Sequence, residues 1–121
     1  MKDFAAVLLT MLVMDGLWLG VIQKDYVSRK IREINGSQPL AHPAWTFALA
    51  YLLMASALYL FCVKDRRPLW QAAFLGLTVY GVFDLTMHNL VARWGLKDVA
   101  MDMAWGVTVF TVSAWVGLQF R

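Results

Sequence analysis

Four long apolar stretches dominate the pattern of hydrophobic and polar positions along the chain. Each holds roughly 20 residues, and a helix of that length, rising about 1.5 Å per residue, crosses a hydrocarbon core of about 30 Å. None of them alternates apolar and polar residues as a barrel strand does, and a helix satisfies its own backbone hydrogen bonds in lipid. The predicted membrane spans are residues 4–22, 44–63, 69–90 and 99–118.

The connections between these stretches contain one further predicted helix. Over residues 23–35 the apolar side chains recur at helical spacing between charged ones, so this helix either extends the first span or lies flat at the interface. Asn35 and Gly36 are suited to end it. Residues 64–67 form a tight polar turn before Pro68, and residues 91–98 form the third connection. An even number of spans puts both termini on one side of the membrane, called here the terminal side, opposite the loop side.

Composition supports this all-α, four-transmembrane-helix bundle. Apolar residues make up 60% of the chain and charged residues 16%, against about half and a quarter in soluble domains. The net charge of +3 fits contact with anionic lipid headgroups and is too weak to suggest nucleic acid. Six Lys and Arg on the loop side against five on the terminal side leave the orientation open. With the lipid bilayer as the expected partner, we treat residues 1–121 as one integral membrane domain.

Three aspartates, Asp15, Asp84 and Asp102, lie inside the apolar spans. Translocon scales assign a cost of about 2.5–3.5 kcal/mol to one such residue at a helix centre. Counted from the span ends, all three lie in the loop-side half, roughly 5–10 Å below that interface. Intramembrane carboxylates are candidates for function, and here they would share protons, pair with a loop cation or bind a metal. The alternative is that they only accept hydrogen bonds between packed helices.

Other polar and aromatic residues accompany these aspartates. A tryptophan follows Asp15 and Asp102 at a distance of three residues, and a buried indole N–H needs an acceptor. His88 lies one helical turn after Asp84, which makes these two weak candidates for metal ligands, with Asp15, Asp102 or His42 as a third. No cofactor is expected. The candidate ligand-binding or proton-binding residues are Asp15, Asp84, His88, Asp102, Trp18, Trp105, Tyr80, Thr86 and Asn89.

Small residues at a spacing of four predict close approach of helices. Gly16 and Gly20 form the clearest pair, and the default expectation is packing within the bundle. The alternative is contact with a second copy or with another membrane protein. The pairs on helices three and four are Ala72 with Gly76 and Ser113 with Gly117.

The chain resembles a family of small bacterial four-helix membrane proteins classified only as a domain of unknown function. The resemblance rests on Asp-x-x-Trp-Leu-Gly at residues 15–20, Tyr-Gly-x-x-Asp-Leu-Thr at residues 80–86, Trp94, and Asp-x-x-Trp-Gly at residues 102–106. Phe83 and Met87 depart from the family's usual tyrosine and asparagine, and Gly95 from its common proline. The resemblance implies the fold and a bacterial cytoplasmic membrane, and it implies no activity.

Three hypotheses for function follow from these residues. In the first, the carboxylates bind or move a proton, a cation, or a small polar or lipid ligand. In the second, the chain is a membrane-embedded enzyme acting on a lipid or isoprenoid, with Asp84 and His88 as acid and base or metal ligands. In the third, it is a non-catalytic accessory or assembly subunit of a membrane complex, with the aspartates separated and the Gly16/Gly20 face exposed.

Overall fold

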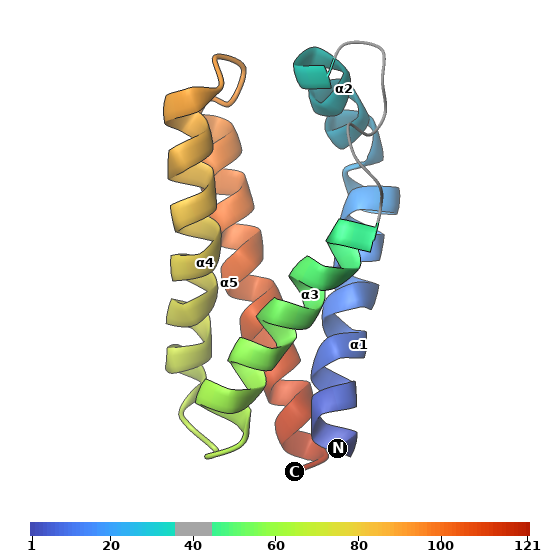
Figure 1. Cartoon of the computed structure of the whole chain (residues 1–121), viewed down its shortest axis with the longest axis vertical. Helices are drawn as coiled ribbons and strands as arrows, with labels where there is room; N and C mark the ends of the chain where they lie inside the picture. Colours follow the sequence, from blue (N-terminus) through green and yellow to red (C-terminus); the bar gives the residue numbers. More distant parts are fainter. Residues whose placement is uncertain (36–44) are drawn as a thin grey trace.

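The computed structural model describes residues 1–35 and 45–121, and these residues fold entirely into helices and short connections (Figure 1). Two of the long helices end in a π-helical turn. In chain order the elements are α1 (Lys2–Leu17), η1 (Trp18–Ile22), α2 (Lys24–Asn35), α3 (Trp45–Leu58), η2 (Tyr59–Val63), α4 (Leu69–Leu90) and α5 (Leu96–Gln119). The all-helical prediction is confirmed, including α2. Pro39, His42 and Pro43 lie outside the described residues.

The arrangement separates two ends of the molecule. Both ends of the chain lie at one end of the bundle, together with the turn between α3 and α4, whereas α2 and the connection from α4 to α5 lie at the other (Figure 1). Helix α5 is central, because it packs along α4 and also against α1. Helix α1 in turn contacts α3, so the four long helices form one bundle.

Three of the described helices are long and apolar enough to cross a membrane. The fourth predicted span is α4, a helix of 22 residues that falls outside this set. Its length is sufficient, but its polar residues lower its apolar character. These residues are Gln71, Asp84, His88 and Asn89. The three that qualify are Lys2–Ile22, Trp45–Val63 and Leu96–Gln119.

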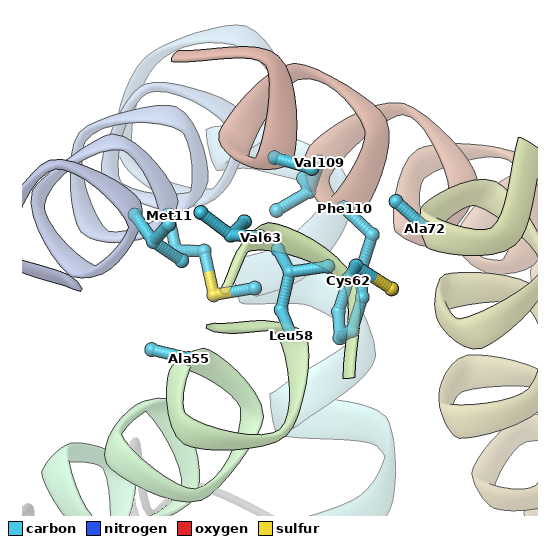
Figure 2. Packing of buried hydrophobic residues seen from close by; sticks show 10 residues of the cluster. Met11, Ala55, Leu58, Cys62, Val63, Ala72, Val109 and Phe110 are labelled. Carbon is cyan, nitrogen blue, oxygen red and sulfur yellow. The ribbon is translucent and has the colours of Figure 1, made fainter. Parts of the chain in front are cut away.

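The terminal half of the bundle contains an apolar core of buried side chains. Met11 of α1, Leu58 of α3, and Val109 and Phe110 of α5 are almost completely buried there (Figure 2). Close helix approach makes this core compact, since a Cβ atom built on Gly76 would lie 2.5 Å from the Gly106 carbonyl oxygen. The small residues of α4 and α5 therefore pack within the bundle, as predicted.

Gly16 and Gly20 behave differently. A Cβ atom built on either glycine would meet no described atom within 4 Å, and both residues are exposed. The default expectation that this pair packs within the bundle is therefore wrong over the described residues. Gly16 of α1 and Gly20 of η1 instead form part of an open outer surface with Leu12, Leu19 and Phe47.

Helix α5 begins at Leu96, earlier than the predicted residue 99. The Asp98 carboxylate accepts a hydrogen bond of 2.9 Å from the Gly95 backbone N–H, which satisfies a free donor at the start of the helix. The polar first turn is thus part of the helix although it carries no apolar signal. Asp98 is buried as a result of this position.

Candidate functional site

Asp15 connects all four long helices near the end of α1. Its side chain is buried, and its Oδ1 accepts a hydrogen bond of 2.6 Å from Trp105 Nε1 on α5. The Tyr80 hydroxyl of α4 lies 3.5 Å from Asp15 Oδ2, and the Tyr51 hydroxyl of α3 is a further hydrogen-bond partner. Every one of these donors is an uncharged indole or phenol, so the contacts orient the Asp15 carboxyl group without placing a positive charge beside it.

Asp84 is completely buried on the face of α4 that packs on α5. Its Oδ1 accepts a hydrogen bond of 3.2 Å from Trp94 Nε1 in the following connection. Its Oδ2 receives no hydrogen from any described donor, and its other hydrogen-bonding neighbour is the carboxyl group of Asp102. Two ionised carboxylates are both acceptors, so this pair forms a hydrogen bond only when one of them holds a proton. Asp84 and Asp102 thus place two carboxyl groups side by side.

Asp102 joins the two other aspartates. Its carboxyl group lies beside that of Asp84 and within electrostatic range of Asp15. Unlike its two neighbours it is only partly buried. The structure thus brings together the three aspartates that the sequence places in the loop-side half, with Asp102 as the member that is open to solvent or ligand.

Two tryptophans form a stacked pair beside these carboxyl groups. The Trp18 and Trp105 rings are 4.3 Å apart at their centroids and inclined by only 11°. Each tryptophan follows an aspartate by three residues, yet Trp105 bonds Asp15 across the bundle and not Asp102 on its own helix. The repeated spacing therefore builds one mixed cluster from α1, η1 and α5.

A cavity of about 440 Å³ opens beside the cluster between α1, α3, α4 and α5. Asp15 and Asp102 supply its charged groups, and the remaining surface is mainly aromatic and aliphatic. This combination, an apolar cleft with a few convergent polar groups, is the usual form of a small-molecule site. The other lining residues are Trp18, Leu19, Phe47, Ala50, Tyr51, Leu53, Met54, Val79, Tyr80, Phe83 and Trp105.

Comparison with known families agrees with this architecture. Residues 1–119 match the family described as "Predicted membrane protein (DUF2177)". The chain belongs to the DUF2177 family. No curated protein and no solved structure matches it. Membership in DUF2177 confirms the predicted resemblance to a membrane family of unknown function, so the chemistry of the site has to be argued from its residues.

The aspartates and tryptophans that carry the DUF2177 resemblance meet in the site, whereas Thr86, Gly16 and Gly20 of the same motifs do not. Trp94 and Asp84 are hydrogen-bonded, and Trp105 bonds Asp15. Phe83, which departs from the family's tyrosine, lines the cavity without a hydroxyl group. The polar lining of this member is therefore set chiefly by its aspartates and by the tyrosines of α3 and α4.

Three predicted residues of α4 do not join the cluster. Thr86, His88 and Asn89 are exposed and line neither of the two cavities beside the aspartates. The His88 Nδ1 atom lies 2.7 Å from the Trp94 carbonyl oxygen, so this ring supports the connection between α4 and α5. Among the described residues no three acidic, histidine or cysteine side chains are grouped to hold a metal ion.

A second, smaller cavity of about 150 Å³ lies under α2 and was not foreseen from the sequence. Lys30 of α2 lines it and forms an ion pair of 3.0 Å with buried Asp98, while also bonding the Arg93 carbonyl oxygen at 2.6 Å. Asp102 and Trp18 line both cavities, so α2 covers the loop-side end of the site.

Some sequence signals for these contacts exist. The pair Gly95 and Asp98 ahead of an apolar run has the spacing of a helix-start motif, which would have placed Asp98 in the first turn of α5. Lys30 carries no comparable signal, because its partner lies 68 residues away in the chain (98 − 30). Tyr51 is equally hidden among the apolar residues of α3.

Proposed function

We propose that the chain crosses the bacterial cytoplasmic membrane four times and binds a small ligand in the carboxylate cavity. The observation that carries the proposal is the 440 Å³ cavity, because it combines two carboxyl groups with an otherwise apolar lining. Buried ionisable groups inside membrane proteins commonly mark paths for ligands or protons. The chemistry supported is reversible binding of a proton, a cation or a small polar or lipid molecule.

The fourth span in this proposal is α4. Its most costly residue for a bilayer, Asp84, is fully buried against α5 and is not presented to lipid. Exposed positions along the helix are largely apolar, as at Phe74, Leu77 and Val82. A helix of 22 residues with this distribution can cross beside α5, which puts both termini on one side.

Helix α2 is assigned to the membrane interface. Its apolar side chains Tyr26, Val27, Ile31 and Ile34 line the smaller cavity. Several of its charged residues are exposed, which suits contact with water and headgroups. In this position α2 would control access to the carboxylate cavity from the loop side.

A proton shared between the neighbouring carboxyl groups of Asp84 and Asp102 is a second property that we propose for the site. Protonation of the pair would depend on the charge placed beside Asp102, the member that lines the cavity. A ligand that alters this charge would change how firmly the proton is held. Binding and proton transfer would then be coupled through one residue.

A membrane-embedded enzyme is the second candidate. It is favoured by the same carboxyl pair, because a protonated and an ionised carboxyl group side by side can serve as general acid and base. The accessory-subunit alternative is favoured by the exposed Gly16 and Gly20 and disfavoured by the clustering of the aspartates.

The test uses dicyclohexylcarbodiimide, an apolar reagent that modifies protonated carboxyl groups within membranes. Applied to the protein in nanodiscs, it is expected to modify Asp102, as located by peptide mass spectrometry, and to modify fully buried Asp84 far less. The change Asp102→Asn should remove the main product, whereas Asp65→Asn in the exposed turn before α4 should leave it unchanged. Absence of any reaction at Asp15, Asp84 and Asp102 would refute an accessible carboxylate cavity.

A further inference from the structure

The charge of the cavity is unbalanced. Its lining contains the carboxyl groups of Asp15 and Asp102 and, over the described residues, no Lys, Arg or His. The donors to Asp15 are an indole and two phenols, none of which carries a positive charge. Removing an ionised carboxylate from water is costly unless a positive partner or a proton accompanies it.

No described cation is positioned to supply that partner. Lys30, which lines the adjoining smaller cavity, is 3.0 Å from Asp98 and 3.7 Å from Glu33. It also donates to the Arg93 carbonyl oxygen at 2.6 Å, so its hydrogen-bonding capacity is already used. The carboxyl groups of Asp15 and Asp102 in the cavity therefore have no cationic partner among the described residues.

The walls of the cavity attract positive charge as well. Six aromatic residues line it, and the face of an aromatic ring carries negative potential that binds ammonium groups. Desolvated cation–π contacts are worth about 2 kcal/mol or more, most strongly with tryptophan. These rings are Trp18, Phe47, Tyr51, Tyr80, Phe83 and Trp105.

The rest of the lining selects against small inorganic ions. Leu19, Leu53, Met54 and Val79 form a broad apolar surface that a compact, hydrated Mg²⁺ or Ca²⁺ ion would leave uncovered. The volume of about 440 Å³ is also within the range of cavities that hold organic ligands. An anionic headgroup or phosphate would meet two carboxyl groups and no basic side chain among the lining residues that the structure describes.

We propose that the ligand is an organic cation with an apolar body, such as a hydrophobic amine or quaternary ammonium compound. This assignment rests on the proposed function of the cavity and names its ligand class. The cationic group lies between Asp15 and Asp102 against the stacked Trp18 and Trp105 rings. The apolar body occupies the side of the cavity formed by α3 and α4.

The experiment compares two probes of the same shape. Benzyltrimethylammonium carries a permanent charge, and neopentylbenzene has carbon in place of its nitrogen and is neutral. Binding is measured by saturation-transfer NMR on the protein in phosphatidylcholine nanodiscs, with empty nanodiscs subtracted because the neutral probe also enters lipid. We expect the cation to bind about tenfold or more tightly than the neutral probe at the protein.

Variants show which carboxyl groups cause the preference for the cationic probe. Asp15→Asn and Asp102→Asn keep the size of the side chain and should each weaken binding of the cation by about tenfold while leaving the neutral probe unchanged. Asp65→Asn is the matched control, since Asp65 is exposed in the turn between η2 and α4. An elution volume and a helical circular dichroism spectrum that match those of the unaltered chain show that each variant is folded. The comparison of the two probes on the unaltered chain does not depend on any variant.

The outcomes separate this assignment from the proposed function. Equal binding of both probes, unaffected by either variant, would overturn the cation assignment and leave a neutral ligand site. Binding of neither probe would also overturn it, whereas the carbodiimide reaction tests independently whether the cavity carboxyl groups are accessible. Preferential binding of the cation that is lost in Asp102→Asn supports it.

Discussion

Replacement of Gly76 by alanine tests the close packing of α4 on α5, on which the position of Asp84 depends. The added Cβ atom would lie 2.5 Å from the Gly106 carbonyl oxygen and 2.8 Å from the Cβ atom of Phe110. Unstrained carbon contacts lie at about 3.5–4.0 Å, so α4 has to move away by roughly 1 Å. The carbonyl oxygen is part of the α5 backbone and cannot rotate aside.

The expected cost combines two opposing terms. Overpacking of a close contact destabilises by about 1–3 kcal/mol, and alanine in place of glycine inside a helix stabilises by about 0.5–1 kcal/mol. Because the clash involves a backbone atom, we expect an overpacking cost in the upper half of that range. We expect Gly76→Ala to lower the free energy of unfolding by about 1–2 kcal/mol.

Gly16→Ala provides a matched control in another helix. No described atom lies within 4 Å of a Cβ built there, so only the helix-propensity gain remains. Both variants are unfolded in mixed micelles by increasing SDS and followed by tryptophan fluorescence. Equal stability of Gly76→Ala and Gly16→Ala would refute the close approach of α4 and α5. A lowered degree of self-association in Gly16→Ala alone would indicate that the open glycine face contacts a second copy.

Three further results are expected. Trp105→Phe removes the hydrogen bond of 2.6 Å to the α1 carboxylate and should cost about 1–2 kcal/mol in the same unfolding assay, whereas Trp115→Phe at an exposed position should cost almost nothing. Lys30→Met removes the ion pair between α2 and Asp98, so the rate of amide hydrogen exchange in α2 should rise about 5–30-fold while exchange in α5 stays unchanged. The control Lys24→Met, at an exposed position of α2, should not raise the exchange rate. Asp84→Asn supplies an amide donor in place of the shared proton, so the infrared band of a protonated carboxyl group should disappear while the protein stays folded; persistence of the band would contradict proton sharing.

The sequence predicts the helices well because the length of an apolar run is fixed by the membrane. Residues 69–90 form a helix with the expected bounds, and the depth of Asp15, Asp84 and Asp102 could be counted along the chain. Depth and helix direction predict only that these aspartates lie at one level of the structure. Their convergence depends in addition on how each helix is rotated.

Rotation of the helices about their axes could not be predicted. Gly16 and Gly20 form a familiar packing motif, yet α1 turns them outward while Asp15, the adjacent residue, points into the bundle. The partner of Trp105 depends on the same rotation, because two aspartates lie within reach of an indole at that depth. The ion pair between Lys30 and Asp98 depends on the path of α2, and periodicity alone leaves that path open.

The π-helical turn η1 fits one additional residue into the chain just before α2. A π turn holds one residue more than an α turn, and both complete about one revolution. Deleting a single residue from Trp18–Ile22 would therefore convert η1 to an α turn and change the direction of the following side chains only slightly. A deletion within α2 ahead of Lys30 would instead rotate this side chain by about 100° and take it from Asp98. A one-residue deletion in Trp18–Ile22 should therefore disturb the ion pair between Lys30 and Asp98 less than a one-residue deletion in the first turn of α2.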